Sequence, residues 1–163
     1  MACCERNLEE LKKDYALFEK KYSLPDFEEM NHEFLIESLA ETETELLLNH
    51  IRKTMAEKLA FFYKFIEVIL NPSEGGSLFV FSVTKTLKQE DRKILAEIYE
   101  KISKLEIEAL KRELDYSEEG EAEFIKRIYS FWKESKGSLL EILGVIESNW
   151  DNKLGKNEKS YFR

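Results

Sequence analysis

The sequence predicts an all-α protein, a globular helical bundle of about six helices with two long central antiparallel helices. Three observations predict this class. The chain of 163 residues contains only six Gly and two Pro, the residues that most disfavour helix interiors. Glu, Lys and Leu, which are strong helix formers, are abundant. Finally, the spacing of a helix-capping box recurs along the chain: an Asn, Asp, Ser or Thr followed three residues later by Glu or Gln.

Each capping pair stands just before a run of apolar residues at helical spacing. The side chain of the first residue accepts a hydrogen bond from a free N–H of the first turn, and the second residue bonds back to the first. The five pairs are Asn7/Glu10, Asp26/Glu29, Thr42/Glu45, Thr86/Gln89 and Ser138/Glu141. They divide the chain into the predicted helices.

The N-terminal half predicts three helices. The first covers residues 7–22, and the second begins at Asp26 and continues to Leu39. The third runs from Thr42 to Asn71 and is about 42 Å long at 1.5 Å per residue. Its second half is apolar over most of its circumference, because Phe61, Phe65 and Val68 widen the stripe, so we expect it to be the buried central element.

Residues 72–77 form a Gly-rich loop, and residues 78–83 are the only β-like run, Leu-Phe-Val-Phe-Ser-Val. Three conformations remain open for this run: an extended segment over the core, a short helical turn, or an edge strand that pairs with another subunit. A fourth helix follows over residues 86–116. Its buried side is predicted to include the apolar residues Leu87, Ile94, Leu95, Ile98, Ile102, Leu105, Ala109 and Leu110.

Two further helices complete the bundle. One covers residues 121–136 and ends at Gly137, which suits a left-handed cap. The other starts at Ser138 and ends near Trp150. We therefore expect a single helical domain over residues 1–150 and a mobile, polar, basic tail over residues 151–163.

Composition excludes several classes of function. The net charge of −8 disfavours a nucleic-acid binder, although Lys153, Lys156 and Lys159 make the tail basic. No apolar run is long enough for a transmembrane helix. The N-terminus lacks the apolar core of a signal peptide, so we expect a cytoplasmic protein with Cys3 and Cys4 reduced. The excess of Glu and Lys over Gln and His is typical of thermophile proteins, and equally of long helices.

The sequence indicates no catalytic or cofactor-binding residue. A di-iron helical bundle needs two Glu-x-x-His pairs, and only Glu29 and His32 make one. A mononuclear metal site using Glu29, His32 and Glu33, or one at His50, remains an alternative of low weight. Phosphate-binding loops, calcium loops and nucleophile motifs are absent from the sequence.

The remaining features indicate protein interaction. Aromatic residues outside a core tend to mark interfaces, and the aromatic residues considered for partner binding are Phe79, Phe81, Trp132 and Trp150. We expect a non-enzymatic interaction or scaffold protein, as a homodimer or as a subunit of an assembly. The alternatives are an accessory subunit of a nucleic-acid-processing complex, which would touch phosphate through its tail, and a metal-dependent helical-bundle enzyme.

The segment Tyr22-Ser23-Leu24-Pro25-Asp26-Phe27-Glu28-Glu29-Met30-Asn31 and the run Ile51-Arg52-Lys53-Thr54-Met55-Ala56-Glu57-Lys58-Leu59 resemble stretches of uncharacterised all-helical archaeal proteins. The resemblance extends over residues 8–150. It implies an archaeal, cytoplasmic origin and no known activity, and it assigns a function to none of the residues.

Overall fold

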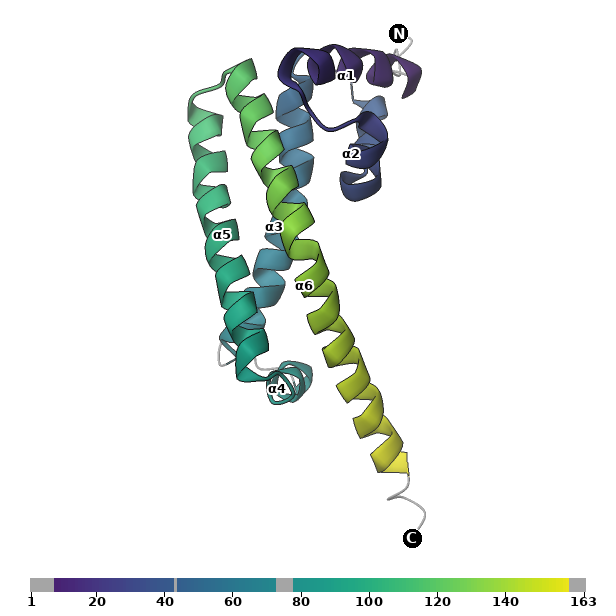
Figure 1. Cartoon of the computed structure of the whole chain (residues 1–163), viewed down its shortest axis with the longest axis vertical. Coiled ribbons are helices and arrows are strands. Elements are labelled where there is room, and N and C mark those ends of the chain that lie inside the picture. Colours follow the sequence, from purple (N-terminus) through teal and green to yellow (C-terminus); the bar gives the residue numbers. More distant parts are fainter. Residues whose placement is uncertain (1–7, 43, 73–77, 159–163) are drawn as a thin grey trace. The chain divides into compact units, whose positions relative to one another are not determined.

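A computed structural model of the chain describes residues 8–42, 44–72 and 78–158, with the backbone alone at residues 78, 79, 81 and 151–158. Seven helical elements follow one another, and the described residues contain no strand (Figure 1). They are α1 (Leu8–Tyr22), α2 (Phe27–Phe34), the 3₁₀ helix η1 (Ile36–Glu41), α3 (Leu47–Leu70), α4 (Leu78–Thr84), α5 (Gln89–Leu114) and α6 (Glu118–Glu158). The predicted all-α class is confirmed.

The described residues form two compact units. Of the described residues, unit 1 comprises those within 8–60 and 105–131, and unit 2 those within 61–104 and 132–158. Helices α3, α5 and α6 each contribute residues to both units, while α1, α2 and η1 belong to unit 1 and α4 to unit 2. Within each unit, α3 and α5 run antiparallel (Figure 1). A single domain over residues 1–150 stays a prediction.

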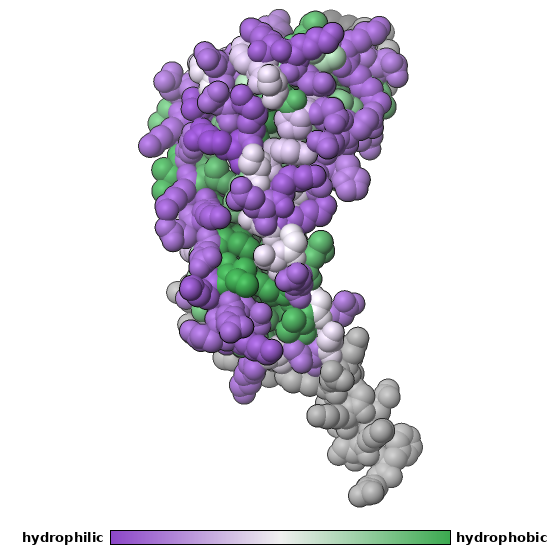
Figure 2. All heavy atoms as spheres, viewed as in Figure 1, coloured by the Kyte–Doolittle hydropathy of each residue, from purple (hydrophilic) through white to green (hydrophobic). Residues whose placement is uncertain are grey.

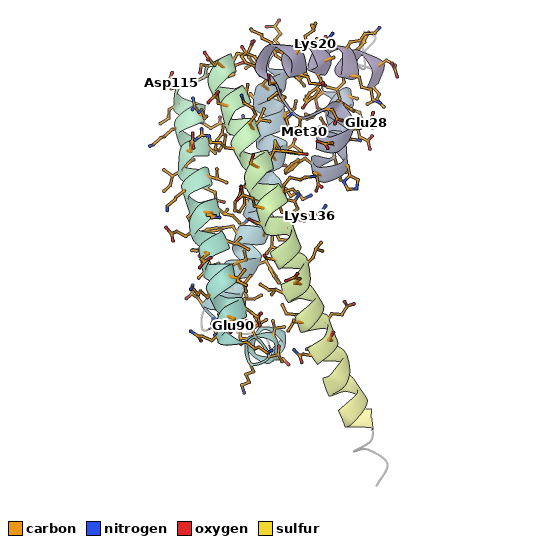
Figure 3. All side chains as sticks on the ribbon, viewed as in Figure 1. Lys20, Glu28, Met30, Glu90, Asp115 and Lys136 are labelled. Carbon is orange, nitrogen blue, oxygen red and sulfur yellow. The ribbon has the colours of Figure 1, made fainter. Side chains whose placement is uncertain are left out.

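The core of unit 1 gathers the apolar sides of α1, α2, α3 and α6. Met30 lies on the inner side of α2 and is fully buried, whereas Glu28 lies on its outer side (Figure 3). The Tyr15 ring contacts Phe27 edge-on at 5.5 Å, and its hydroxyl donates to the carbonyl of Pro25 at 2.6 Å. This bond satisfies the one polar group of a buried ring and fixes the turn between α1 and α2.

The predicted cap at Asp26 is confirmed, since its Oδ1 accepts a hydrogen bond from the Glu29 N–H at 3.0 Å. The prediction of a single helix that continues to Leu39 is wrong, because α2 ends at Phe34 and Leu35 adopts a left-handed conformation with φ 56°. The chain then turns into η1. The Asn31 side chain holds this turn by accepting from the Glu37 N–H at 2.9 Å, which local spacing alone did not predict.

The start of α3 also differs from the prediction. The helix begins at Leu47, not at Thr42. Thr42 follows η1 in an extended conformation. The Thr44 hydroxyl accepts a hydrogen bond from the N–H of Leu46, the residue before the helix, at 2.9 Å. The capping-box spacing pointed to Thr42, because Glu45 follows it by three residues, whereas the residue three positions after Thr44 is Leu47.

In unit 2, the β-like run at residues 78–83 forms the short helix α4, the second of the three conformations left open by the sequence. Val80 and Val83 are buried on one side of it. The Thr84 hydroxyl donates to the Val80 carbonyl at 3.0 Å. The Thr86 hydroxyl likewise donates to the Val83 carbonyl, at 2.7 Å, so Thr86 closes α4 and α5 begins three residues later, at Gln89.

Helix α6 is one element of 41 residues where the sequence predicted two helices separated at Gly137. Gly137 and Ser138 lie inside the helix, so neither caps an end. The cost of a mid-helix Gly is only about 1 kcal/mol, and burial of Leu139, Ile142 and Ile146 in unit 2 exceeds it. The backbone stays helical to Glu158, so the predicted tail begins inside α6, and residues 159–163 lie outside the described part of the chain.

Candidate protein-interaction surface on helix α5

The ten residues of α5 that belong to unit 1, Leu105–Leu114, differ from the rest of the helix. In unit 2, α5 buries Leu95, Ile98 and Ile102. Among residues 105–114, by contrast, none is buried. This segment therefore needs contacts of another kind to stay in unit 1.

Ion pairs attach the segment to α3 and α6. Glu113 pairs with Arg52 and, at 3.5 Å, with Lys53, both on α3. Glu108 pairs with Arg127 on α6 and, at 3.6 Å, with Arg112 on α5 itself. The hydrogen bond from Arg52 lowers the pKa of Glu113 and outweighs desolvation, which raises it; the charges of Arg52 and Lys53 lower this pKa further. The charged side of this segment thus faces its own unit.

Arg52 anchors this arrangement from within the core. Its Nε donates to Oε2 of Glu121 on α6 at 2.6 Å, and the two side chains are 2% and 0% exposed. The second oxygen of Glu121 is buried without a hydrogen-bond partner in the described structure. The Arg52 guanidinium therefore joins α3, α5 and α6. Because the pair with Glu121 is buried, removing either partner would leave an unpaired charge in the core.

The apolar side of the segment faces outwards. Ile107, Leu110 and Leu114 are 57%, 67% and 90% exposed, and their spacing of three and four residues puts them on one face of the helix. Figure 2 shows hydrophobic residues exposed on the side of the molecule formed by α5. We call this face, defined by Ile107, Leu110 and Leu114, the α5 stripe.

The α5 stripe corrects a prediction from the sequence. Leu110 was expected on the buried side of the helix together with Ile94, yet both are exposed. Periodicity showed that apolar residues share a face of the helix. It did not show that ion pairs occupy the inner side of this segment, because the partners Arg52 and Arg127 are distant in sequence.

The four aromatic residues proposed for partner binding lie in different environments. Trp132 is 4% exposed and packs against Phe62 with ring centroids 5.2 Å apart, which is the position of a core residue of unit 2. Trp150 is 38% exposed. It borders a shallow hollow with Ser82, Val83, Thr86, Ile146 and Asn149. The side chains of Phe79 and Phe81, on α4, lie outside the described residues.

The residues considered for metal binding do not gather into one site among the described residues. Glu29 accepts a hydrogen bond from the Tyr129 hydroxyl at 2.8 Å. His32 is exposed, with Nδ1 3.6 Å from the Glu33 carboxylate, and His50 is half-buried on α3. In the part of the chain that the structure describes, no three metal-binding side chains come together. Burial, and then the bond to Glu29, raise the pKa of Tyr129 to about 12.

Other predicted features fall outside the described residues. They are Cys3, Cys4, the capping residue Asn7 and the side chains of Lys153, Lys156 and Lys159. Within the described ranges, no helix combines the length and the apolar character needed to cross a membrane.

Sequence reasoning missed Arg52, although its position was informative. Arg52 stands four residues after Leu48, within the apolar stripe of α3, where a charge is costly unless it is paired. A buried cation there predicts a buried acid on a neighbouring helix. The 28 Glu residues of the chain gave no means of choosing Glu121.

Comparisons with known proteins give no relative from which a role could be transferred. Neither the protein-family models, nor the curated proteins, nor the solved structures include a match to this chain. The function has to be argued from the surface itself.

Proposed function

We propose that this protein is a non-enzymatic helical subunit that binds another protein chain through the α5 stripe. The observation that carries the proposal is the exposure of Ile107, Leu110 and Leu114 on the outer side of a segment whose inner side is held by ion pairs. A surface helix of a globular protein normally turns its apolar side towards the core. Here the orientation is reversed, and a bound partner would remove these side chains from water.

The energetics favour this role over a structural one. Fully burying a Leu or Ile side chain contributes about 1.5–3 kcal/mol, and the residues of the stripe, 57–90% exposed, gain only part of this within their own chain. Exposed ion pairs contribute about 0–1 kcal/mol each. Within its own chain, this segment is therefore held mainly by ion pairs, which contribute little. Burial of the apolar side chains, which contributes more, would occur on binding a partner.

Isolated exposed leucines are common on protein surfaces and need no explanation. Leu17 on α1 is an example, being 69% exposed. The residues three and four positions away from it are Lys13, Asp14, Lys20 and Lys21. The α5 stripe is different because its three members are neighbours on one helix face.

A photo-reactive amino acid tests the proposal directly. Placed at position 110 in cells of the source organism, it should give a cross-linked adduct of one defined mass after illumination. The same amino acid at position 17 is the matched control, because Leu17 and Leu110 are 69% and 67% exposed. No adduct at position 110, or the same set of adducts at both positions, would contradict the proposal.

We further infer that the protein works in the cytoplasm of a thermophilic organism. The surface ion pairs support this, since Lys12–Glu28, Lys21–Glu118 and Lys104–Glu100 have N–O distances of 2.7, 2.6 and 2.6 Å and such pairs gain in value at high temperature. Thermal unfolding is the test. A midpoint within the range of about 45–65 °C typical of mesophile domains would count against a thermophilic source.

A further inference from the structure

We propose that Tyr63 and Tyr99 form a site of oxidative modification, at which hydrogen peroxide and a haem peroxidase join the two phenol rings by a carbon–carbon bond, as dityrosine. Tyr63 lies on α3 and Tyr99 on α5, and both belong to unit 2. The proposal is independent of the α5 stripe, which belongs to unit 1.

The two rings are stacked with their hydroxyls together. Their centroids are 4.5 Å apart and their planes differ by 15°, and the two hydroxyl oxygens are 2.6 Å apart. Because the ring centres and the hydroxyls are both close, the two rings point in the same direction. The ortho carbons, which lie next to the carbon that bears each hydroxyl, therefore face the same gap. These are the carbons at which two tyrosyl radicals combine.

A carboxylate stands at the end of this pair. The Tyr99 hydroxyl donates to Oε1 of Glu67 at 3.3 Å. A hydroxyl carries a single proton, so in this arrangement Tyr63 donates to the Tyr99 oxygen. The hydrogen bond with Tyr63, and then desolvation, raise the pKa of Tyr99 above the ordinary 10.0, which keeps it a neutral phenol. Its oxidation therefore has to remove a proton as well as an electron, and Glu67 is placed to accept that proton.

The reaction can be written with its electrons and protons balanced. Tyr99 gives one electron to the oxidant and its hydroxyl proton to Glu67, which releases the proton to water. A hydrogen atom then passes from the Tyr63 hydroxyl to the Tyr99 oxygen, and Tyr99 loses a second electron and proton by the same route. The two phenoxyl radicals form one carbon–carbon bond, after which each ortho carbon loses its proton and each oxygen regains one. In total, two electrons and two protons leave the pair and reduce one hydrogen peroxide to two water molecules.

The product would be a bond within one chain. Tyr63 and Tyr99 are both half-buried, so their rings are close to each other and poorly placed to meet the ring of a second molecule. The bond would join α3 to α5 across 36 residues of sequence. Like a disulfide, it would restrain the unfolded chain, so we expect the oxidised protein to unfold at a higher urea concentration than the untreated protein.

Peptide mapping of the full chain tests the proposal. After treatment of a dilute solution with hydrogen peroxide and a haem peroxidase, we expect dityrosine fluorescence and a monomer whose mass is lower by two hydrogen atoms. Proteolysis should then give one linked pair of peptides, which contain positions 63 and 99. The absence of this linked pair, or links that join other tyrosines instead, would overturn the proposal. This measurement uses the native protein, so a variant that fails to fold cannot obscure it.

Variants test the role of each group. Tyr63→Phe and Tyr99→Phe should each lose the cross-linked monomer, whereas Tyr116→Phe, the matched control at a 43% exposed tyrosine, should keep it. Undiminished cross-linking in Tyr63→Phe would overturn the pair as the site. Glu67→Gln keeps both rings and removes the base, so the initial rate of cross-linking should fall by about tenfold or more. A rate equal to that of the native protein would overturn Glu67 as the proton acceptor.

Discussion

Arg52 is the residue on which unit 1 most depends. It is among the largest fully buried side chains of the described structure, and it is bonded to Glu121 in the core and Glu113 at the surface. Taking a charge out of water costs several kcal/mol, which the partner charge offsets only when the geometry is good. The pair is thus more important for defining how three helices meet than for net stability.

Arg52→Met should destabilise the protein by about 3–5 kcal/mol, because it leaves the Glu121 carboxylate buried and unpaired. Urea unfolding measures the effect. The double variant Arg52→Met/Glu121→Leu should recover most of the loss, since no charge is then left in the core.

Lys53→Met is the matched control for Arg52→Met. Lys53 also pairs with Glu113, but it is exposed, so we expect a change within about 0.5 kcal/mol. Equal losses for Lys53→Met and Arg52→Met would show that the buried pair with Glu121 is not what matters.

We expect the Tyr129 hydroxyl to lose its proton at a higher pH than an ordinary tyrosine. Burial, and then its hydrogen bond to Glu29, raise its pKa to about 12 from the ordinary 10.0. A raised pKa in the folded state means that the protonated hydroxyl stabilises the fold below pH 10, and that this contribution is lost as the pH rises from about 10 to 12. The tyrosinate absorbance of the native protein minus that of Tyr129→Phe isolates this group. A midpoint near pH 10 would contradict the expected shift.

Helix α6 shows that a helix can continue through a residue at which an isolated helix of the same sequence would be expected to end. Gly137 stands where the sequence predicted a break, but its backbone is helical and a Cβ added there would meet no atom within 4 Å. The helix continues because the residues after Gly137 are buried in unit 2. Tertiary contacts outweigh the local preference.

Gly137→Ala should therefore stabilise the protein by about 0.5–1 kcal/mol, because Ala loses less conformational freedom than Gly on entering a helix. Thermal or urea unfolding measures the gain. Gly120→Ala is the contrasting variant, since its Cβ would lie 2.6 Å from the Ser117 Oγ at the start of α6, and we expect no gain there. A loss of stability in Gly137→Ala would indicate a left-handed cap and two separate helices.

At the scale of the whole molecule, the exposed α5 stripe belongs to a chain with a net charge of −8 and many Glu and Lys residues. Such charges oppose non-specific association through exposed apolar residues. They also limit association to surfaces where opposite charges meet. The α5 stripe, with Lys on one edge and Glu on the other, is such a surface.

Leu110→Glu should abolish co-purification of the partner chain from cells of the source organism while leaving the free energy of unfolding within about 0.5 kcal/mol of the native value. The reason is that Leu110 is already exposed in the single chain, so only the contact with a partner is lost. Leu17→Glu should change neither quantity. Unfolding of Leu110→Glu would mean that this leucine packs within its own chain.

The sequence by itself determined the all-α class, the cap at Asp26 and the apolar sides of α1, α3 and α6, because these follow from local spacing and backbone chemistry. Tertiary structure alone decided that α6 runs through Gly137, that Arg52 and Glu121 meet, and that Leu110 faces outwards. The physical reason is that a periodic pattern specifies a face of a helix but not its neighbour. Which face is buried depends on residues far apart in the chain. On α5, the ion pairs of Glu108 with Arg127 and of Glu113 with Arg52 lie on the inner side of the helix.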